Sequence, residues 1–178
     1  MIEGIEYLSP KAEGCTVGLF KDGAVRIGPW PDLDASRSKM ISFRQTPPCL
    51  VERGAVHPGL AADEHARPHQ WGSSETGEVE IRRSAVGIDE SGKTLYYGLG
   101  EWVTAKSLAD GMRAAGAWTA AELDINWSYT YWLFYGRSSP SAPPQVTSTL
   151  VPKIKHSSQG HVAKSSYRDF FYLIRKNH

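Results

Sequence analysis

Apolar residues recur along this chain in short runs, and most of the runs have the length of a β-strand. The run Cys15 to Phe20 and the alternating segment Ala24 to Gly28 flank Asp22-Gly23, a dipeptide that favours a tight hairpin turn. The segment 127–135 is almost entirely aromatic or apolar, which predicts a strand buried on both faces. Further strands are predicted at 40–44, 49–51, 78–89, 94–98, 118–125 and 168–175.

One segment has helical spacing instead. Its apolar positions are Leu108, Met112 and Ala115. Thr104 or Ser107 can cap the start of this helix, and Gly116 stands where a left-handed residue commonly ends one. Many strands with one helix predict an α+β fold, in which a mixed, mostly antiparallel sheet carries one main helix packed on it.

The length of 178 residues predicts a single domain over 1–178, with a polar, aperiodic surface loop at 59–77. The loop carries Asp63, Glu64, His65 and His69, which superficially resemble a metal site. Pro68 disfavours the helix that a paired-histidine zinc site needs, so we interpret these residues as a solvated loop and predict no metal site. Segments 30–38 and 136–144 are also predicted as loops.

Charge and hydropathy restrict the partners. The formal net charge is +1 and the basic residues are scattered, which argues against a nucleic-acid partner. No apolar run is long enough to cross a membrane, and no signal peptide is visible. Cys15 and Cys49 are the only cysteines; the count leaves open whether they form a disulfide, and they are too few for a structural zinc site.

A polar interruption near the end of a predicted strand is the main candidate for chemistry. Asp124 and Asn126 alternate with Ile125 and precede Trp127, so on a regular strand both polar side chains share one face. They can hold a phosphate ester, a cation or a water molecule. The alternative is a polar strand end that caps the following turn.

The order of motifs resembles the phosphodiester glycosidase family. The family has an Arg-Thr-Ala-(Ile/Val)-Gly-(Ile/Val) strand, a hairpin, a helix and then a strand ending in Leu-Asp-Gly-Gly-Gly-Ser; the matching pieces here are 83–89, 104–117 and 122–126. Segments 18–23 and 42–45 also resemble the middle of such domains, and 168–171 resembles a closing strand of some bacterial relatives. The chain is thus similar to a divergent, bacterial-type member.

The resemblance implies a hydrolase that releases a sugar linked through a phosphodiester. Its implied catalytic residues are Arg83, which neutralises the phosphate, Asp124 as acid/base or water-positioning group, and Asn126, which orients ligand or water. The residues expected to bind substrate are Trp127, Ser128, Arg44 and Gln45. The implied partner is a carbohydrate or sugar phosphate; no cofactor is firmly implied, and a divalent cation stays open.

This sequence departs from the family in two places. Asp-Ile-Asn-Trp-Ser at 124–128 replaces the glycine-rich turn, and the Asn-Gly-Gly-Phe-Phe stretch that opens the family domain has no match. The second departure leaves open whether the chain is part of a longer precursor. Location is likewise unknown: the resemblance suggests a secreted or periplasmic protein, although no signal peptide is visible.

Two other functions compete with hydrolysis. Loss of the glycine-rich turn favours a non-catalytic domain that binds glycans or the cell envelope, using the aromatic strand and the long loop. A structural fragment of a larger exported protein is the third alternative. On a strand, Trp127, Tyr129 and Tyr131 share one face and either stack on sugar rings or form an aromatic ladder in the core.

Overall fold

The computed structural model describes residues 1–61, 70–158, 161 and 171–175. The fold is α+β, with antiparallel sheets and one main helix, which confirms the predicted fold class. The chain forms two compact units, Met1–Thr130 and Tyr131–His178, and each is described by itself. The single domain predicted over 1–178 stays a prediction.

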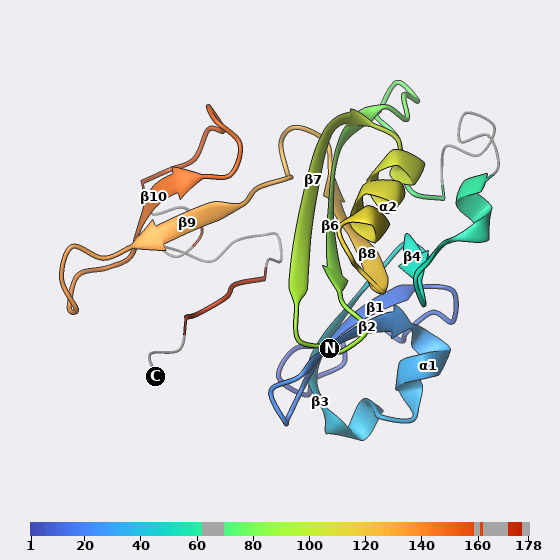
Figure 1. Ribbon diagram of the computed structural model, residues 1–178. Helices are drawn as coiled ribbons and strands as arrows, with labels where there is room; N and C mark the ends of the chain where they lie inside the picture. The colour runs from blue at the N-terminus through green and yellow to red at the C-terminus, as the bar shows by residue number, and fades with distance from the viewer. Residues whose placement is uncertain (62–69, 159–160, 162–170, 176–178) are drawn as a thin grey trace. The chain divides into compact units, whose positions relative to one another are not determined.

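A three-stranded antiparallel sheet in the order β2-β1-β3 opens the first unit (Figure 1). Gly23, with φ of 84°, makes the predicted turn between β1 and β2. The predicted loop at 30–38 instead contains the short helix α1 and is followed by a 3-10 helix at Arg37–Lys39, because Pro31 sits at the helix start, where proline is favoured. The elements are β1 (Cys15–Phe20), β2 (Val25–Pro29), α1 (Trp30–Asp34) and β3 (Met40–Thr46).

A five-stranded antiparallel sheet in the order β5-β4-β8-β6-β7 forms the rest of this unit. Its inner strand β6 is buried along its whole length, because it lies between a helix on one face and the first sheet on the other. A short 3-10 helix follows β5 at Pro58–Ala61. The strands are β4 (Val51–Glu52), β5 (Ala55–Val56), β6 (Ile81–Ile88), β7 (Leu95–Val103) and β8 (Thr119–Ile125).

Helix α2 (Ala105–Ala114) covers one face of the five-stranded sheet (Figure 1). Thr104 is its N-cap, as predicted, and its hydroxyl accepts a hydrogen bond from the Ser107 backbone N–H at 3.1 Å. Leu108 and Met112 point into the core, and Gly116 follows the helix with φ of 107°. The sequence therefore predicted both ends of this helix.

Two glycines of the sheet let α2 approach closely. A Cβ atom added to Gly98 would lie 2.5 Å from the Met112 sulfur, and one added to Gly87 would lie 2.9 Å from Met112 Cε. We expect Gly87→Ala to lower the free energy of unfolding by about 1–3 kcal/mol through overpacking. The matched control is Gly111→Ala on the exposed side of α2, where a Cβ meets nothing within 4 Å.

Alanine at position 111 should stabilise the protein by up to about 1 kcal/mol, because glycine is a poor helix former. Urea unfolding of both variants measures the two effects. Equal, small changes for Gly87→Ala and Gly111→Ala would show that α2 packs less tightly on the sheet than described.

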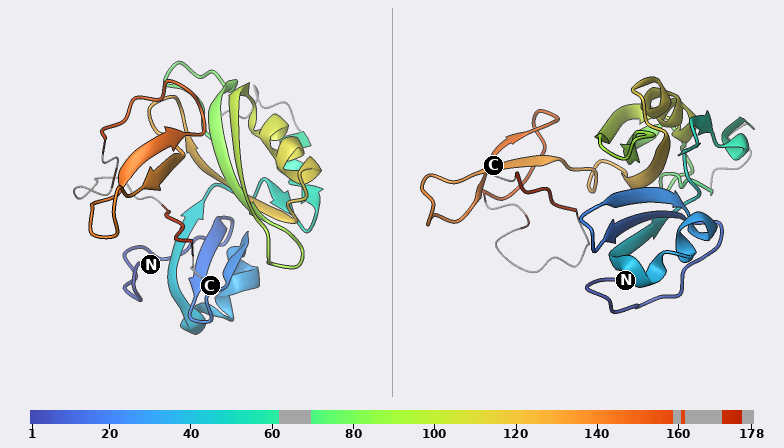
Figure 2. Two further views of the ribbon diagram at one scale, coloured as in Figure 1. Left: turned by 60° about the vertical axis from the view of Figure 1, so that its left-hand side comes forward. Right: turned by 60° about the horizontal axis from the view of Figure 1, so that its bottom comes forward.

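The two sheets of the first unit pack face to face through a shared apolar cluster, and both panels of Figure 2 show them as separate layers. Val17 of β1, Val86 of β6 and Ala121 of β8 belong to this cluster. A disulfide between Cys15 and Cys49 lies within it and joins β1 to the segment before β4. The structure thus pairs the two thiols whose state the sequence left open.

The second unit contains a hairpin of β9 (Leu133–Gly136) and β10 (Gln145–Thr149). Of the buried strand predicted over 127–135, only residues 133–135 lie in a strand, and the predicted burial is wrong: residues 127–129 form a turn, and Trp127, Tyr129, Phe134 and Tyr135 are exposed. Aromatic content there does not mean burial. Of the strand predicted at 168–175, residues 168–170 lie outside the described part and 171–175 adopt no regular structure.

Candidate functional site

An extra residue in β8 decides where Asp124 points. Arg83 of β6 pairs with Ile125 and Ala85 pairs with Glu122, so a step of two residues in β6 faces a step of three in β8. This is a β-bulge, which interrupts the alternation of side chains. Glu122 therefore stays on the face covered by α2, whereas Asp124 lies beside Arg44 of β3 on the opposite face.

The other neighbour of β6 carries a second bulge at the same level. Ile81 pairs with Val103 and Arg83 pairs with Gly100, so a step of two residues in β6 faces a step of three in β7. Trp102 lies in this bulge with φ of 56° and a side chain that is 67% exposed. A positive φ is strained for a bulky aromatic residue, and such strain concentrates at functional sites. We call the region between the two bulges the bulged end of the sheet.

Asp124 forms a long, open ion pair in this region. Its Oδ1 atom lies 3.8 Å from Arg44 Nη2, and the two side chains are 38% and 32% exposed. Its backbone carbonyl accepts a hydrogen bond from the Ser84 hydroxyl at 2.8 Å. An ion pair of this length and exposure contributes little to stability, so a ligand can rearrange it at low cost.

Tyr97 of β7 is a polar neighbour that the sequence analysis missed. Burial is the largest effect on the pKa of its phenol and raises it, and the charge of Asp124 also raises this pKa. A hydrogen bond with Ser84 and the charge of Arg82 lower the pKa. The phenol is thus protonated at neutral pH. It lies within electrostatic reach of the Asp124 carboxylate.

An aromatic pair stands beside these groups. The rings of Trp102 and Trp127 lie 5.3 Å apart and are tilted by 60°. The Arg82 guanidinium lies 4.0 Å from the centre of the Trp127 ring and bonds to Glu101 Oε1 at 2.6 Å. Cation–π contact and ion pairing fix Trp127 while leaving it 43% exposed.

Arg83, expected to contact phosphate, is fully buried on the α2 face of the sheet. Its guanidinium donates to Glu122 Oε1 at 2.7 Å and to four backbone carbonyls, those of Trp71, Gly72, Val79 and Val103. These bonds engage Nε and both terminal nitrogens. The structure therefore does not bring Arg83 into one open site with Asp124; Arg82, its neighbour in sequence, faces that site instead.

Asn126 lies just beyond β8 with φ of 73°. Its N–H donates to the Arg82 carbonyl at 2.8 Å, and its own carbonyl accepts from the Thr130 hydroxyl at 3.0 Å. Asparagine tolerates this left-handed conformation better than most residues. Because of the bulge and this turn, strand alternation does not determine the direction of its side chain.

The remaining predicted residues separate into two groups. Trp127 and Ser128 share the exposed turn that follows β8. Gln45, although next to Arg44, bonds to both the N–H and the carbonyl of Lys11 and to the Thr16 hydroxyl. Arg44 therefore lies beside Asp124, whereas the hydrogen bonds of Gln45 fix the segment before β1.

The residues that the structure describes contain no group of three acidic, histidine or cysteine side chains that could hold a metal ion. They also contain no helix long and apolar enough to cross a membrane. The loop residues Asp63, Glu64, His65 and His69 lie outside this part of the chain.

Three residues at or near the bulged end were absent from the sequence-based candidates: Glu101, Trp102 and Tyr97. Local sequence contains no signal for them, because a bulge arises from pairing between distant strands. For Arg82 the doublet at 82–83 is an indication, since neighbouring strand residues face opposite sides.

Comparison with known proteins gives partial structural similarity only. No family model matches the sequence, and no curated protein matches it. The catalytic domain of zebrafish N-acetylglucosamine-1-phosphodiester alpha-N-acetylglucosaminidase matches with a TM-score of 0.47 and 20% identity, over 65% of this chain and 41% of that one. A hypothetical protein from Synechocystis matches with a TM-score of 0.41 and 18% identity, over 58% of this chain and 18% of that one.

The chain therefore spans less than half the length of either structure. Similarity at this level assigns neither a family nor an activity. The structure identifies the chain as an α+β protein with a curled antiparallel sheet. Its membership of the phosphodiester glycosidase family stays a prediction.

Proposed function

We propose that the bulged end of the sheet binds and hydrolyses a sugar linked through a phosphodiester. The observation that supports this most is the ion pair of Asp124 with Arg44 at the end of the sheet that also carries the exposed pair Trp102 and Trp127. One carboxylate, one guanidinium and two indole faces match the three parts of the reaction: water, phosphate and sugar ring.

A single carboxylate is sufficient for this substrate class. Most glycosidases use two, one of which protonates the leaving oxygen. A phosphate leaves as a stable anion, so the site must neutralise it rather than protonate it. We assign this neutralisation to Arg44, because Arg83 is buried and engaged by Glu122 and backbone carbonyls.

In the proposed reaction, the oxygen of a water molecule forms a bond to the anomeric carbon of the sugar. The bond between that carbon and the phosphate oxygen breaks, and its electron pair stays on the phosphate. Asp124 accepts the proton of the water molecule and releases it to solvent. Asn126 orients the water or ligand, and Trp127 and Ser128 contact the sugar; Arg83 acts by positioning β8 through Glu122.

Asp124→Asn is the primary test, because it keeps the size of the side chain and removes the base. The substrate is the methyl diester of N-acetylglucosamine 1-phosphate, and the measurement is release of free sugar. We expect a loss of about 10²–10⁴-fold for Asp124→Asn and about 10²-fold for Arg44→Met. Arg53→Ala, on the exposed β4–β5 turn, is the control and should be unchanged. Equal turnover by wild type and Asp124→Asn would refute the proposal.

Asn126 allows a separate test of chemistry against backbone conformation. Glycine also adopts a positive φ, so Asn126→Gly preserves the turn and removes only the amide. Loss of turnover in a folded Asn126→Gly variant supports a role in orienting water or ligand. Full turnover limits Asn126 to the turn.

A non-catalytic glycan-binding domain is the second candidate, and the 67% exposure of Trp102 favours it. In that case the protein binds glycan without turnover, and binding survives Asp124→Ala but is lost in Trp127→Ala. Calorimetric titration of these two variants with the same glycan separates the two functions.

A further inference from the structure

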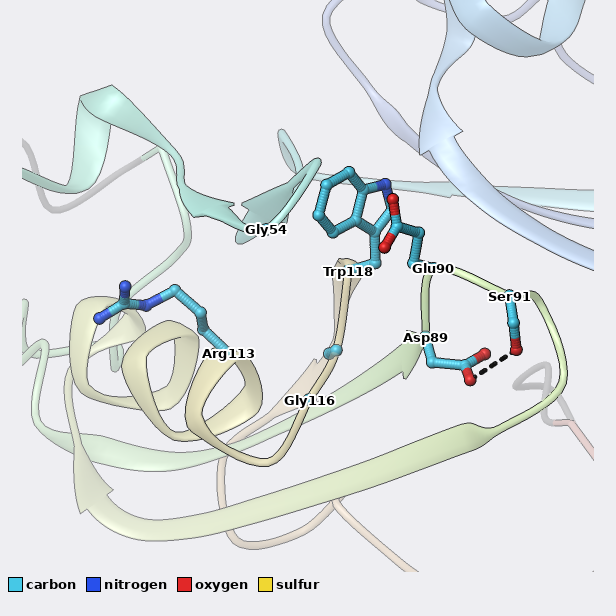
Figure 3. Close-up of a pocket in the computed structure, with 8 residues that line it drawn as sticks. Gly54, Asp89, Glu90, Ser91, Arg113, Gly116 and Trp118 are labelled. Carbon is cyan, nitrogen blue, oxygen red and sulfur yellow. Dashed lines mark hydrogen bonds between the residues drawn. The ribbon is translucent and has the colours of Figure 1, made fainter.

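A concave surface lies at the end of the five-stranded sheet opposite the bulged end. It is an open depression of about 570 Å³ between the β4–β5 turn, the β6–β7 turn and the end of α2 (Figure 3). The strand β6 separates it from the bulged end: the six steps from Arg82 to Ile88 correspond to roughly 20 Å. We call this surface the Trp118 depression.

Trp118 is held in place on both sides of its backbone. Its N–H donates to the Ile88 carbonyl at 2.8 Å, and its carbonyl accepts from the Gly54 N–H at 2.8 Å. The indole lies against Gly54, where an added Cβ would be 2.8 Å from the ring atom Cζ3. Gly54 has φ of 78° in the β4–β5 turn, so glycine satisfies both the turn and the close contact. The result is a fixed indole that remains 37% exposed.

Polar groups of both signs line the depression; the Glu90 carboxylate lies near the indole, whereas the Arg113 guanidinium points away from it (Figure 3). Arg113 projects from α2, and within the described residues its ionic partner is Asp110, at 4.0 Å. Glu90 lies in the β6–β7 turn, and no hydrogen bond or ion pair among the described residues engages its carboxylate. Asp89, by contrast, is committed to its own turn, accepting from the Ser91 hydroxyl at 2.8 Å and from backbone N–H groups.

We propose that the Trp118 depression is a second ligand site, which binds a neutral oligosaccharide. One sugar ring offers an apolar face to the indole and hydroxyl donors to Glu90, and a neighbouring ring offers hydroxyl acceptors to Arg113. A ligand of either net charge meets repulsion, from Glu90 and Asp89 or from Arg113. The site is separate from the bulged end, so its occupancy does not depend on the activity proposed there.

The test follows the indole N–H signal of Trp118 in the ¹⁵N-labelled chain by NMR, with Trp118→Phe to assign the signal. The probes are cellotetraose and chitotetraose, two neutral oligosaccharides. We expect a saturable shift at millimolar concentration, the usual range for one shallow contact. Glu90→Gln and Arg113→Gln should each weaken binding by about fivefold, which corresponds to a net hydrogen-bond contribution of about 1 kcal/mol.

Asp124→Asn and Trp127→Ala are the controls for the bulged end and should leave the Trp118 shift unchanged. Their failure to hydrolyse substrate would concern the other site only. Three results overturn the proposal: no shift up to about 10 mM probe, an equal shift in the Glu90→Gln/Arg113→Gln double variant, or a shift with the anionic tetragalacturonate alone.

Discussion

Replacing Glu122 with alanine is expected to lower the free energy of unfolding by about 3–5 kcal/mol, because it leaves the Arg83 guanidinium buried without its counter-charge. Both side chains of this pair are only 1% exposed, and their nitrogen and oxygen atoms lie 2.7 Å apart. Solvent screening therefore does not reduce the effect. Urea unfolding followed by circular dichroism measures it.

Two further variants make this prediction sharper. Replacing a buried ion pair with apolar residues is often neutral, but Arg83→Met with Glu122→Met should remain destabilising, because the four carbonyls bound to Arg83 lose their donor. Lys106→Ala removes an exposed pair with Asp110 and should change stability by less than about 0.5 kcal/mol. A Glu122→Ala effect as small as that of Lys106→Ala would contradict the buried network.

Removing the disulfide with Cys15→Ala and Cys49→Ala should cost about 4 kcal/mol, because it frees a loop with a sequence separation of 34 in the unfolded chain. Both cysteines lie in the apolar cluster between the two sheets, so the loss of packing adds to the entropic effect. Unfolding midpoints with and without a reductant measure the difference.

The double variant provides the control, since reductant should change its midpoint very little. Reductant should shift the wild-type midpoint toward that of the variant. A wild-type midpoint that does not move while mass spectrometry shows two free thiols would contradict the stabilising role of the disulfide.

Much of the fold follows from local sequence signals. Asp22-Gly23 and the alternation around it predicted the first hairpin, and Thr104 and Gly116 predicted the ends of α2. The wrong predictions rest on amino-acid composition, which does not determine the path of the backbone. The prolines at 29 and 31 predict a loop, although proline is common at a helix start. The aromatic run at 127–135 predicts burial, although Asn126 turns the chain out of the sheet.

The candidate site was predictable in part. The sequence located Asp124 and Arg44, which the structure places 3.8 Å apart. It could not assign faces to Arg82 and Arg83, because both are buried and only the packing of α2 on one side distinguishes them. It also could not detect the bulges, which depend on how β6 pairs with strands that follow it in the chain.

The bulge in β8 has a consequence for comparing this chain with other proteins. The direction of Asp124 depends on one additional residue rather than on the residue type itself. A gap-free sequence alignment with a relative that lacks this insertion would match Asp124 to a position facing the helix. Insertion or deletion of a single residue within β8 therefore decides whether a related chain retains the carboxylate on the face opposite α2. Alignments commonly penalise such changes.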